Sequence, residues 1–338
     1  MSSPLAVVEP EVPSPSADGG VYLNAYLRPF RKWLEQDDVS EVIVNTSGEV
    51  WIEQAGNMHL RRVAAPEVDD VLVRRLAEQV ARSTHQGISR QRPLLSATLP
   101  DGARVQFIAP PATRRGWAMA IRRHRLVDLP LSAYAAVPGA GATLADSVEP
   151  AADPIEYLRQ AVLQKRTILV SGGTSSGKTT FLNALLREVP VEERVILIED
   201  TPEIRLHSPA SLGLVAVKGE LGEAQVTTDD LLQATLRLRP DRIVLGELRG
   251  TEAISFLRAI NTGHPGSFST IHANTPLGAL EQLGLMVMHA GLGLTRKDTL
   301  AYARSVIDLV VQLDRRSGTR GISEILDLRA LPPGDSLS

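Results

Sequence analysis

The sequence contains no cysteine, few aromatic residues and no long apolar run. Without cysteine the chain cannot form a disulfide or a thiolate zinc site. No apolar stretch approaches the roughly 18 residues that a membrane-spanning helix needs. The first twenty residues also lack the basic and apolar regions of a secretory signal. We therefore expect a cytoplasmic protein.

Charge is unevenly distributed along the 338 residues, although the net charge is only −3. Val21 to Arg125 contains 16 Lys/Arg and 11 Asp/Glu, whereas the chain from Leu126 onward contains 20 and 25. A basic first half could contact anionic lipid, or a phosphate bound to a neighbouring subunit. Ordinary solvated surface charge is the alternative.

The first part of the chain reads as a tail followed by a small domain. Residues 1–20 are rich in proline, serine and acids, which predicts a disordered tail. Residues 21–125 predict an α+β domain. "EVIVN" and "EVWIE" read as a hairpin around "TSG", "SATLPDGARVQFIA" as two more strands around a turn, and "WAMAIRR" as a further strand.

One helix is expected within this first domain, starting near Pro66, because apolar residues there recur at helical spacing. Its apolar face would carry Val68, Val71, Leu72, Leu76 and Val80.

The second part changes pattern after a linker at residues 126–153, which is rich in glycine, alanine and proline. From 154 to 330, the strand-like runs "TILVSG", "RVILIE" and "RIVLGE" alternate with helical segments. This alternation predicts an α/β fold with a mostly parallel, doubly wound sheet. "DLVVQLDRRSGTRGISEILDL" predicts two final strands, and residues 331–338 form a short C-terminal tail.

A phosphate-binding loop is the clearest motif. "GGTSSGKT" fits G-x-x-x-x-G-K-[ST], and it lies between the strand "TILVS" and the helix "KTTFLNALLREV". Lys178 is expected to reach the β- and γ-phosphates, and the Thr179 hydroxyl to bind magnesium. A glycine-rich turn without a ligand is the alternative. The predicted nucleotide-binding residues are Gly172, Gly173, Thr174, Ser175, Ser176, Gly177, Lys178, Thr179 and Thr180.

Acidic residues end two later strands: Glu199 and Asp200 follow "VILI", and Glu247 follows "RIVLG". Ligands of doubly wound sheets bind at the carboxyl ends of strands, so these carboxylates could hold magnesium through water or orient an attacking water. Glu199 and Asp200 could instead merely cap the following turn. His272 closes the strand "SFSTI" and could sense the γ-phosphate, whereas we expect His264 to be structural.

Four segments together resemble the Walker A, Asp box, Walker B and His box of secretion ATPases: "GGTSSGKTT", "IEDTPE", "RPDRIVLGELRG" and "GHPGSFSTIHANT". Glu247 with no preceding Asp is that family's own form of the second motif. The segment "YLNAYLRPFRKWLEQDDVSEVIVNTSGEVWIE" resembles most the VirB-eleven family of type IV secretion systems. The resemblance runs from about Tyr22 to Leu328.

This resemblance implies a RecA-like C-terminal P-loop domain that uses ATP and Mg2+. It also implies a homo-hexamer at the cytoplasmic face of the inner membrane, which works with other secretion-system components to power secretion or pilus assembly. By position, Glu247 would be the catalytic carboxylate, Glu199 would assist it, and His272 would sense the γ-phosphate. Waters held by Glu199 or Glu247 would complete the magnesium site.

The family also uses arginines outside the loop to neutralise transition-state charge. Candidates are Arg104 in "DGARVQF", Arg122 and Arg123 in "AIRRH", and Arg239 in "RLRPD". Ser175-Ser176 replaces the more usual Gly-Ser of the loop, and we expect little consequence.

Neighbouring families and other classes remain as alternatives. Type II secretion ATPases usually carry a tetracysteine metal site, which this chain lacks, whereas pilus motors are closer rivals. A nucleic-acid translocase, an ATP-gated scaffold and a small-molecule kinase also share such a loop. Phe30, Trp33, Trp51 and Phe107 show no aromatic-basic groove, so no sequence-specific nucleic-acid binding is expected.

Overall fold

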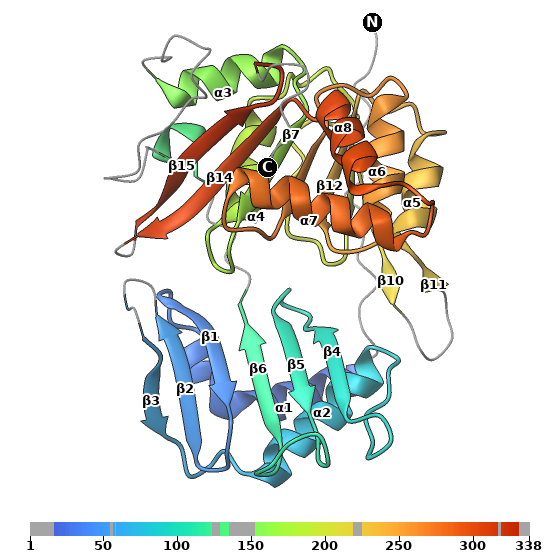
Figure 1. Ribbon diagram of the computed structural model, residues 1–338. Helices are drawn as coiled ribbons and strands as arrows, with labels where there is room; N and C mark the ends of the chain where they lie inside the picture. Colours follow the sequence, from blue (N-terminus) through green and yellow to red (C-terminus); the bar gives the residue numbers. More distant parts are fainter. Residues whose placement is uncertain are drawn as a thin grey trace, which may run out of the picture. The chain divides into compact units, whose positions relative to one another are not determined.

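The computed structural model describes residues 17–54, 57, 59–123, 129–134, 153–218, 225–316 and 319–330. These residues divide into two compact units, and the division falls between Arg125 and Leu126 (Figure 1). The tail predicted for residues 1–20 lies mostly outside the described residues, and a helix begins within it at Ala17. Most of the predicted linker, 126–153, and the tail 331–338 also lie outside them.

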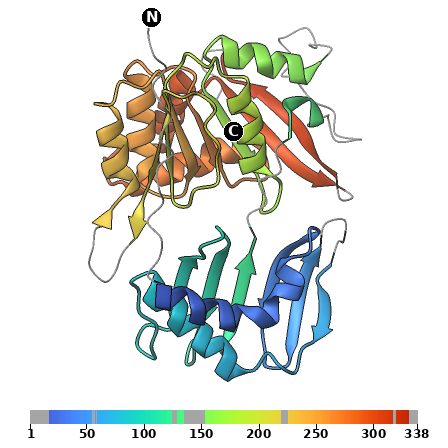
Figure 2. The same cartoon turned by 180° about the vertical axis from the view of Figure 1, so that it is seen from behind.

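The first unit is a six-stranded sheet covered on one face by two helices (Figure 2). Its elements are α1 (Ala17–Leu34), β1 (Val39–Val44), β2 (Glu49–Gln54), β3 (Arg61–Ala64), α2 (Asp70–Ser83), β4 (Leu94–Thr98), β5 (Arg104–Ile108) and β6 (Ala118–Arg122). The strand order is β3-β2-β1-β6-β5-β4, and every neighbouring pair is antiparallel. The two hairpins predicted from the turn sequences are present as β1–β2 and β4–β5.

Alternation of buried and exposed residues explains why these strands bury one face. Along β5 and β6, Val105, Phe107, Met119 and Ile121 point into the core, and their neighbours along each strand are more exposed. Residues on the two strands directly oppose each other, Val105 against Ile121 and Phe107 against Met119. The helices therefore pack on the face that carries these side chains.

The helix predicted to start near Pro66 begins later, at Asp70. The Asp69 side chain accepts a hydrogen bond from the Leu72 backbone N–H at 2.7 Å and so caps the helix. Of the predicted apolar face, Val68, Leu76 and Val80 are buried, whereas Val71 is 47% exposed. Val73, Ala77 and Ala81 complete the buried face of the helix.

The second unit contains a seven-stranded sheet with helices on both faces. Its elements are η1 (Leu131–Ala133), α3 (Pro154–Leu163), β7 (Ile168–Gly172), α4 (Lys178–Arg187), β8 (Val195–Glu199), β9 (Leu212–Val215), β10 (Val217–Lys218), β11 (Gln225–Val226), α5 (Thr228–Thr235), β12 (Arg242–Leu248), α6 (Glu252–Asn261), β13 (Phe268–Ile271), α7 (Pro276–His289), α8 (Arg296–Val306), β14 (Leu309–Arg316) and β15 (Thr319–Asp327).

The sheet order is β15-β14-β7-β13-β12-β8-β9. Neighbouring strands are parallel except for β15, which forms an antiparallel hairpin with β14. One face packs on α6, α7 and α8, and the other on α3, α4 and η1 (Figures 1 and 2). Helices on both faces bury the central strands fully, so β7 and β8 are continuous apolar runs.

The parallel arrangement brings the ends of β7, β8, β12 and β13 to one edge of the sheet. The phosphate loop follows β7, and the predicted acids and His272 lie at the ends of the other three strands. The edge therefore collects every motif that the sequence placed at a strand end within this unit.

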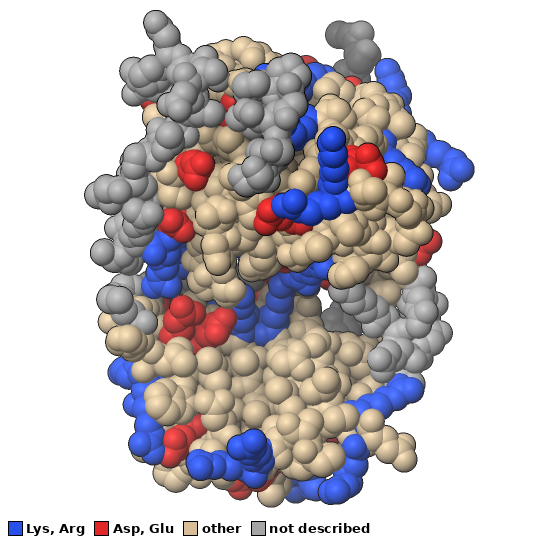
Figure 3. Space-filling view, viewed as in Figure 1, with Lys and Arg blue, Asp and Glu red and all other residues tan. Residues whose placement is uncertain are grey.

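None of the helices in the described ranges combines the length and the apolar character that crossing a bilayer requires. On the face seen in Figure 3, Lys and Arg of the first unit lie towards its margins, and no broad basic patch crosses its centre.

Candidate nucleotide site

The loop between β7 and α4 has the backbone shape that a phosphate cradle needs. Gly177 has a φ of 92°, a conformation that glycine adopts without strain. A Cβ on Gly172 would lie 2.4 Å from the Ser176 Oγ and 3.0 Å from the Leu313 carbonyl oxygen. These two positions therefore require glycine, and the loop turns tightly into the start of α4.

We expected that serine in place of the usual glycine at position 175 would have little effect on the loop, but the backbone of Ser175 is strained. Its φ is 61°, in the left-handed region where a Cβ costs roughly 1–2 kcal/mol. The neighbouring Ser176 is favourably placed, because its buried Oγ donates a hydrogen bond to the Gly173 carbonyl at 2.9 Å. Replacing the usual glycine by Ser175 thus strains this loop.

Lys178, His272 and Glu247 form a continuous chain of contacts at the carboxyl edge. The buried Lys178 Nζ donates to the carbonyls of Gly172 at 2.8 Å and Gly173 at 3.1 Å. It also lies 3.2 Å from the His272 Nδ1. The His272 Nε2 lies 2.7 Å from the Glu247 Oε1. Side chains from α4, β12 and the end of β13 thus meet at one point.

These contacts determine the tautomer of His272. An ammonium group can only donate hydrogen bonds, so Nδ1 facing Lys178 must present its lone pair. The proton then resides on Nε2, the nitrogen that lies 2.7 Å from the Glu247 Oε1. The imidazole of His272 therefore lies between Lys178 and Glu247, with one ring nitrogen facing each.

Arg249 is a site residue that the sequence reasoning missed. Its guanidinium pairs with the Glu247 carboxylate and, at 3.1 Å, with the Asp200 Oδ2. Burial opposes the charge of Arg249, but the two carboxylates outweigh it and raise its pKa above the usual value. A signal was available, because alternate residues of an extended chain share a face and the spacing of Glu247 and Arg249 would have placed them side by side.

Glu199 has the turn-capping role that the sequence left open. It is buried, and its Oε1 accepts hydrogen bonds from the backbone N–H groups of Glu203 at 2.9 Å and Ile204 at 3.0 Å. A Cβ on Gly246 would lie 3.4 Å from the Glu199 Cγ. This is an ordinary van der Waals distance, so the contact with Glu199 does not by itself require glycine at position 246.

The candidate arginines fall in different parts of the molecule. Arg104 and Arg122 directly oppose each other on β5 and β6 of the first unit, and the Arg122 Nε lies 3.4 Å from the Glu41 Oε1. Arg123 donates to the Gln36 carbonyl at 2.7 Å. Contact of these residues with a phosphate stays a prediction.

Arg239 cannot reach a phosphate at Lys178 of its own chain. It precedes β12 and so lies at the amino-end edge of the sheet, opposite to Lys178. The seven residues of β12 span about 20 Å between these edges. A role for Arg239 would have to act on a neighbouring subunit.

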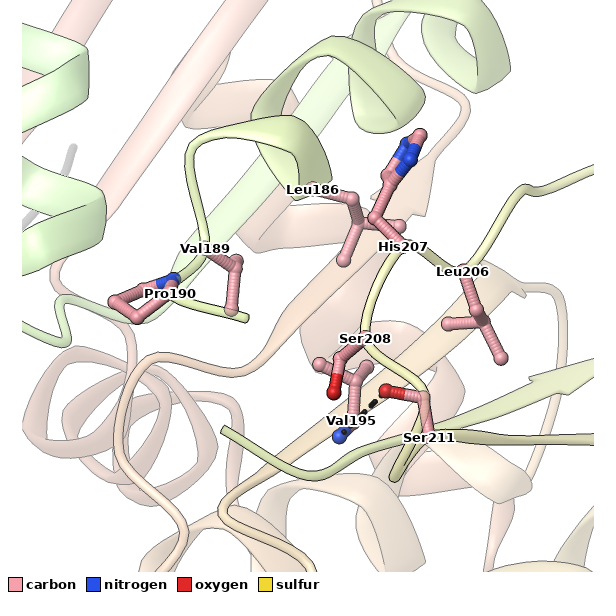
Figure 4. A pocket seen from close by; sticks show the side chains of 8 residues that line it. All are labelled: Leu186, Val189, Pro190, Val195, Leu206, His207, Ser208 and Ser211. Atoms are coloured by element: carbon pink, nitrogen blue, oxygen red, sulfur yellow. Dashed lines mark hydrogen bonds between the residues drawn. The ribbon is translucent and has the colours of Figure 1, made fainter. Parts of the chain in front are cut away.

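A small pocket elsewhere in this unit does not belong to the site. It is lined by Leu186, Val195 and Ser211 among others, and the Ser211 Oγ accepts from the Val195 N–H at 3.1 Å (Figure 4). Val195 begins β8, so this pocket lies at the sheet edge opposite to Lys178. His264 is likewise remote, and its Nδ1 lies 2.9 Å from the Ala259 carbonyl, as expected for a structural histidine.

The sequence matches the family described as "Type II/IV secretion system protein" over residues 25–319. The chain therefore belongs to this family. The type IV secretion system protein PtlH of Bordetella pertussis is 38% identical over 330 residues, covering 90% of this chain and 94% of PtlH. VirB11 of Bartonella quintana is 34% identical over 325 residues, covering 88% and 91%. The predicted resemblance is confirmed.

The fold of this type II/IV secretion protein is also found in a solved structure. The pilus retraction motor PilT with bound ADP has a TM-score of 0.59 at 19% identity, covering 90% of this chain and 82% of PilT. The likeness confirms the predicted α/β fold, with a RecA-like P-loop unit and a smaller N-terminal unit. Family membership and the phosphate loop together make the protein a P-loop ATPase of the secretion type.

Proposed function

We propose that this ATPase hydrolyses ATP to ADP and phosphate to power substrate translocation or pilus assembly by a type IV secretion (conjugation) system. The observation that carries the proposal is the contact chain from Lys178 through His272 to Glu247. A lysine that binds the γ-phosphate, an imidazole beside it and a carboxylate beyond are the groups that hydrolysis needs in one place.

In this account Lys178 exchanges its loop carbonyl partners for the β- and γ-phosphates. Glu247 orients the attacking water, and Arg249 holds that carboxylate in position. His272 detects the γ-phosphate, because its Nδ1 loses the Lys178 ammonium when that group turns to the nucleotide. Thr174, Thr179 and Thr180 lie with the other loop residues around the phosphates.

The available donors suit Mg2+, which prefers oxygen ligands. Thr179 supplies a hydroxyl from the first turn of α4, and Glu247 supplies a carboxylate at the end of β12. Thr179 would bind the ion directly, and Glu247 or Glu199 through water. When bound, the ion neutralises charge on the phosphates. The Glu199 Oε1 holds the backbone of a turn, whereas the Glu247 carboxylate contacts the side chains of Arg249 and His272, which can move when the ion binds.

The assembly part of the proposal rests on family membership. We propose a homo-hexamer that works with other secretion-system components at the cytoplasmic face of the inner membrane, with anionic lipid as a further contact. Arg104 or Arg122 of the first unit, or Arg239 of a neighbouring subunit, would neutralise the transition state. Similarity to PtlH and VirB11 over nearly their whole length supports this assignment.

Replacing Glu247 tests the proposal. Glu247→Gln should lower the steady-state rate of phosphate release by roughly 10²- to 10⁴-fold, because the amide cannot activate water. ATP binding should persist, since Lys178 and the loop are unchanged. Glu281→Gln, an exposed acid paired with Arg296 on the surface, is the matched control and should behave as wild type. Unaltered turnover in Glu247→Gln would contradict the proposal.

The same assay distinguishes a nucleic-acid translocase. A translocase should be stimulated by single-stranded DNA, and its DNA binding should weaken steeply with added salt. Phosphate release that does not respond to DNA supports the secretion ATPase.

A further inference from the structure

The hairpin formed by β14 and β15 ends the sheet on the side of β7, the strand that leads into the phosphate loop (Figure 1). β14 lies beside β7, and their pairing ends at Leu313 opposite Gly172, the last residue of β7. β14 continues to Arg316, and β15 returns from Thr319. The ends of the two strands at Arg316 and Thr319 therefore lie beyond the carboxyl end of β7, where the loop begins.

The register of the hairpin places two arginines on the face that carries α4. Arg315 opposes Arg320, and Leu313 opposes Ile322. Side chains alternate along a strand, so Arg320 shares its face with Ile322. Leu313 and Ile322 are fully buried in the same cluster as Phe181 of α4. Arg320 consequently lies on the side of the sheet where α4 begins.

The Arg320 stem lies against the start of α4. A Cβ on Gly177 would lie 3.4 Å from the Arg320 Cδ, so the arginine stem passes alongside the loop. Against the larger effect of burial, Arg320 and Thr180 both act on Tyr134 to lower its pKa. The Tyr134 ring packs edge-on against Phe181, with centroids 4.9 Å apart, and burial raises its pKa above the usual value.

The loop thus has two distinct flanks. The Lys178 Nζ lies with Gly172, Gly173 and His272, the flank that serves the γ-phosphate. Arg320 lies with Gly177 and, through Tyr134, with Thr180. In such loops the backbone N–H groups hold the α- and β-phosphates, while the lysine reaches further out.

The charges on the second flank favour an anion. Arg315 and Arg320 lie directly opposite each other on the two strands, so this flank carries two positively charged side chains. The positive end of the α4 dipole adds to them. Arg320 lies at an exposed position, and a guanidinium is a planar fork that matches phosphate oxygens.

We propose that Arg320 binds the α- or β-phosphate, the part that ATP and ADP share, and so sets nucleotide affinity rather than the rate of the chemical step. This inference rests on the proposed function of the same site. Arg320 would then affect the dissociation constants of both nucleotides, whereas Glu247 would affect the rate of hydrolysis.

Calorimetric titration of the full chain with ADP, and with a non-hydrolysable ATP analogue, tests the proposal in the presence of Mg2+. Arg320→Gln should weaken both affinities by roughly 10- to 100-fold, the range of a lost charge-assisted hydrogen bond. KM for ATP should rise while kcat changes little, because the contact is the same in ground and transition states. Arg320→Lys should recover part of the loss, since lysine keeps the charge without the fork.

Arg258→Ala, an exposed arginine on α6, is the matched control and should bind both nucleotides as wild type does. Wild-type affinity for ADP in Arg320→Gln would overturn the inference and leave the proposed function intact. Loss of affinity for the ATP analogue alone would also overturn it, because the contact would then be to the γ-phosphate. A wild-type chain that binds neither nucleotide would instead count against the proposed function itself.

Discussion

At the scale of single residues, the hydrogen-bond and ion-pair partners of each polar side chain determine its role in the site. His272 connects Lys178 to Glu247 through its two ring nitrogens, at 3.2 Å and 2.7 Å. Glu199 and Glu247 both end parallel strands, but Glu199 holds the backbone of a turn whereas Glu247 faces His272 and Arg249. The two acids both end a strand, but the carboxylate of Glu199 has a structural role, whereas that of Glu247 contacts side chains of the site.

Sequence alone placed Lys178 and Glu247 at strand ends, because their positions follow from apolar runs and a local motif. The family resemblance ranked Glu247 above Glu199, but the hydrogen bonds of Glu199 to residues 203 and 204 could not be read from the sequence. Arg320 was also missed. It lies more than a hundred residues after Gly177, and only the register of the final hairpin brings the two together.

The strain at Ser175 leads to a prediction about stability. Ser175→Gly should stabilise the folded protein by up to about 1 kcal/mol, because glycine adopts a φ of 61° freely, although it gains entropy in the unfolded chain. Thermal unfolding followed by circular dichroism measures the change.

Ser176→Ala is the matched control for that change. It removes the hydrogen bond to the Gly173 carbonyl and should destabilise by about 1 kcal/mol. Destabilisation by both substitutions would show that Ser175 is not strained.

At the scale of helices and strands, local patterns located most elements but not their arrangement. Short turn sequences predicted the hairpins β1–β2 and β4–β5. The apolar runs "TILV" and "VILI" explain why β7 and β8 are buried. The order β3-β2-β1-β6-β5-β4 depends on long-range pairing of β1 with β6, which no local pattern contains. The start of α2 was misplaced because the cap at Asp69 outweighs the apolar residues before it.

The contribution of the Asp69 cap to the free energy of unfolding can be measured separately. Asp69→Ala should destabilise the first unit by about 1 kcal/mol, because the Leu72 N–H loses its acceptor. All three tryptophans of the chain, Trp33, Trp51 and Trp117, lie in this unit, so tryptophan fluorescence during urea unfolding reports on it selectively.

Glu78→Ala is the matched control on the same helix. Glu78 forms only an exposed pair with Arg74 at 3.7 Å, so its loss should cost a few tenths of a kcal/mol. Equal midpoints for wild type and Asp69→Ala would show that the cap does not stabilise the unit.

At the scale of the whole molecule, a strained cradle, a lysine and a carboxylate from separate elements of the second unit meet at one sheet edge, and the first unit carries a pair of adjacent arginines. The proposed function uses both units, because hydrolysis at the edge must be conveyed to a part that moves. The acidic second unit and the basic first half of the chain therefore have different roles in our account: one holds the triphosphate, and the other responds to it.

The central claim is that the strand ends converge on a triphosphate bound at Lys178, and a structure with a non-hydrolysable ATP analogue and Mg2+ tests it most directly. Our account predicts that the Lys178 Nζ leaves the carbonyls of Gly172 and Gly173 and lies about 3 Å from a γ-phosphate oxygen, with His272 and Glu247 on the same side of that phosphate. A γ-phosphate bound away from His272 and Glu247, with Lys178 still on the loop carbonyls, would contradict it.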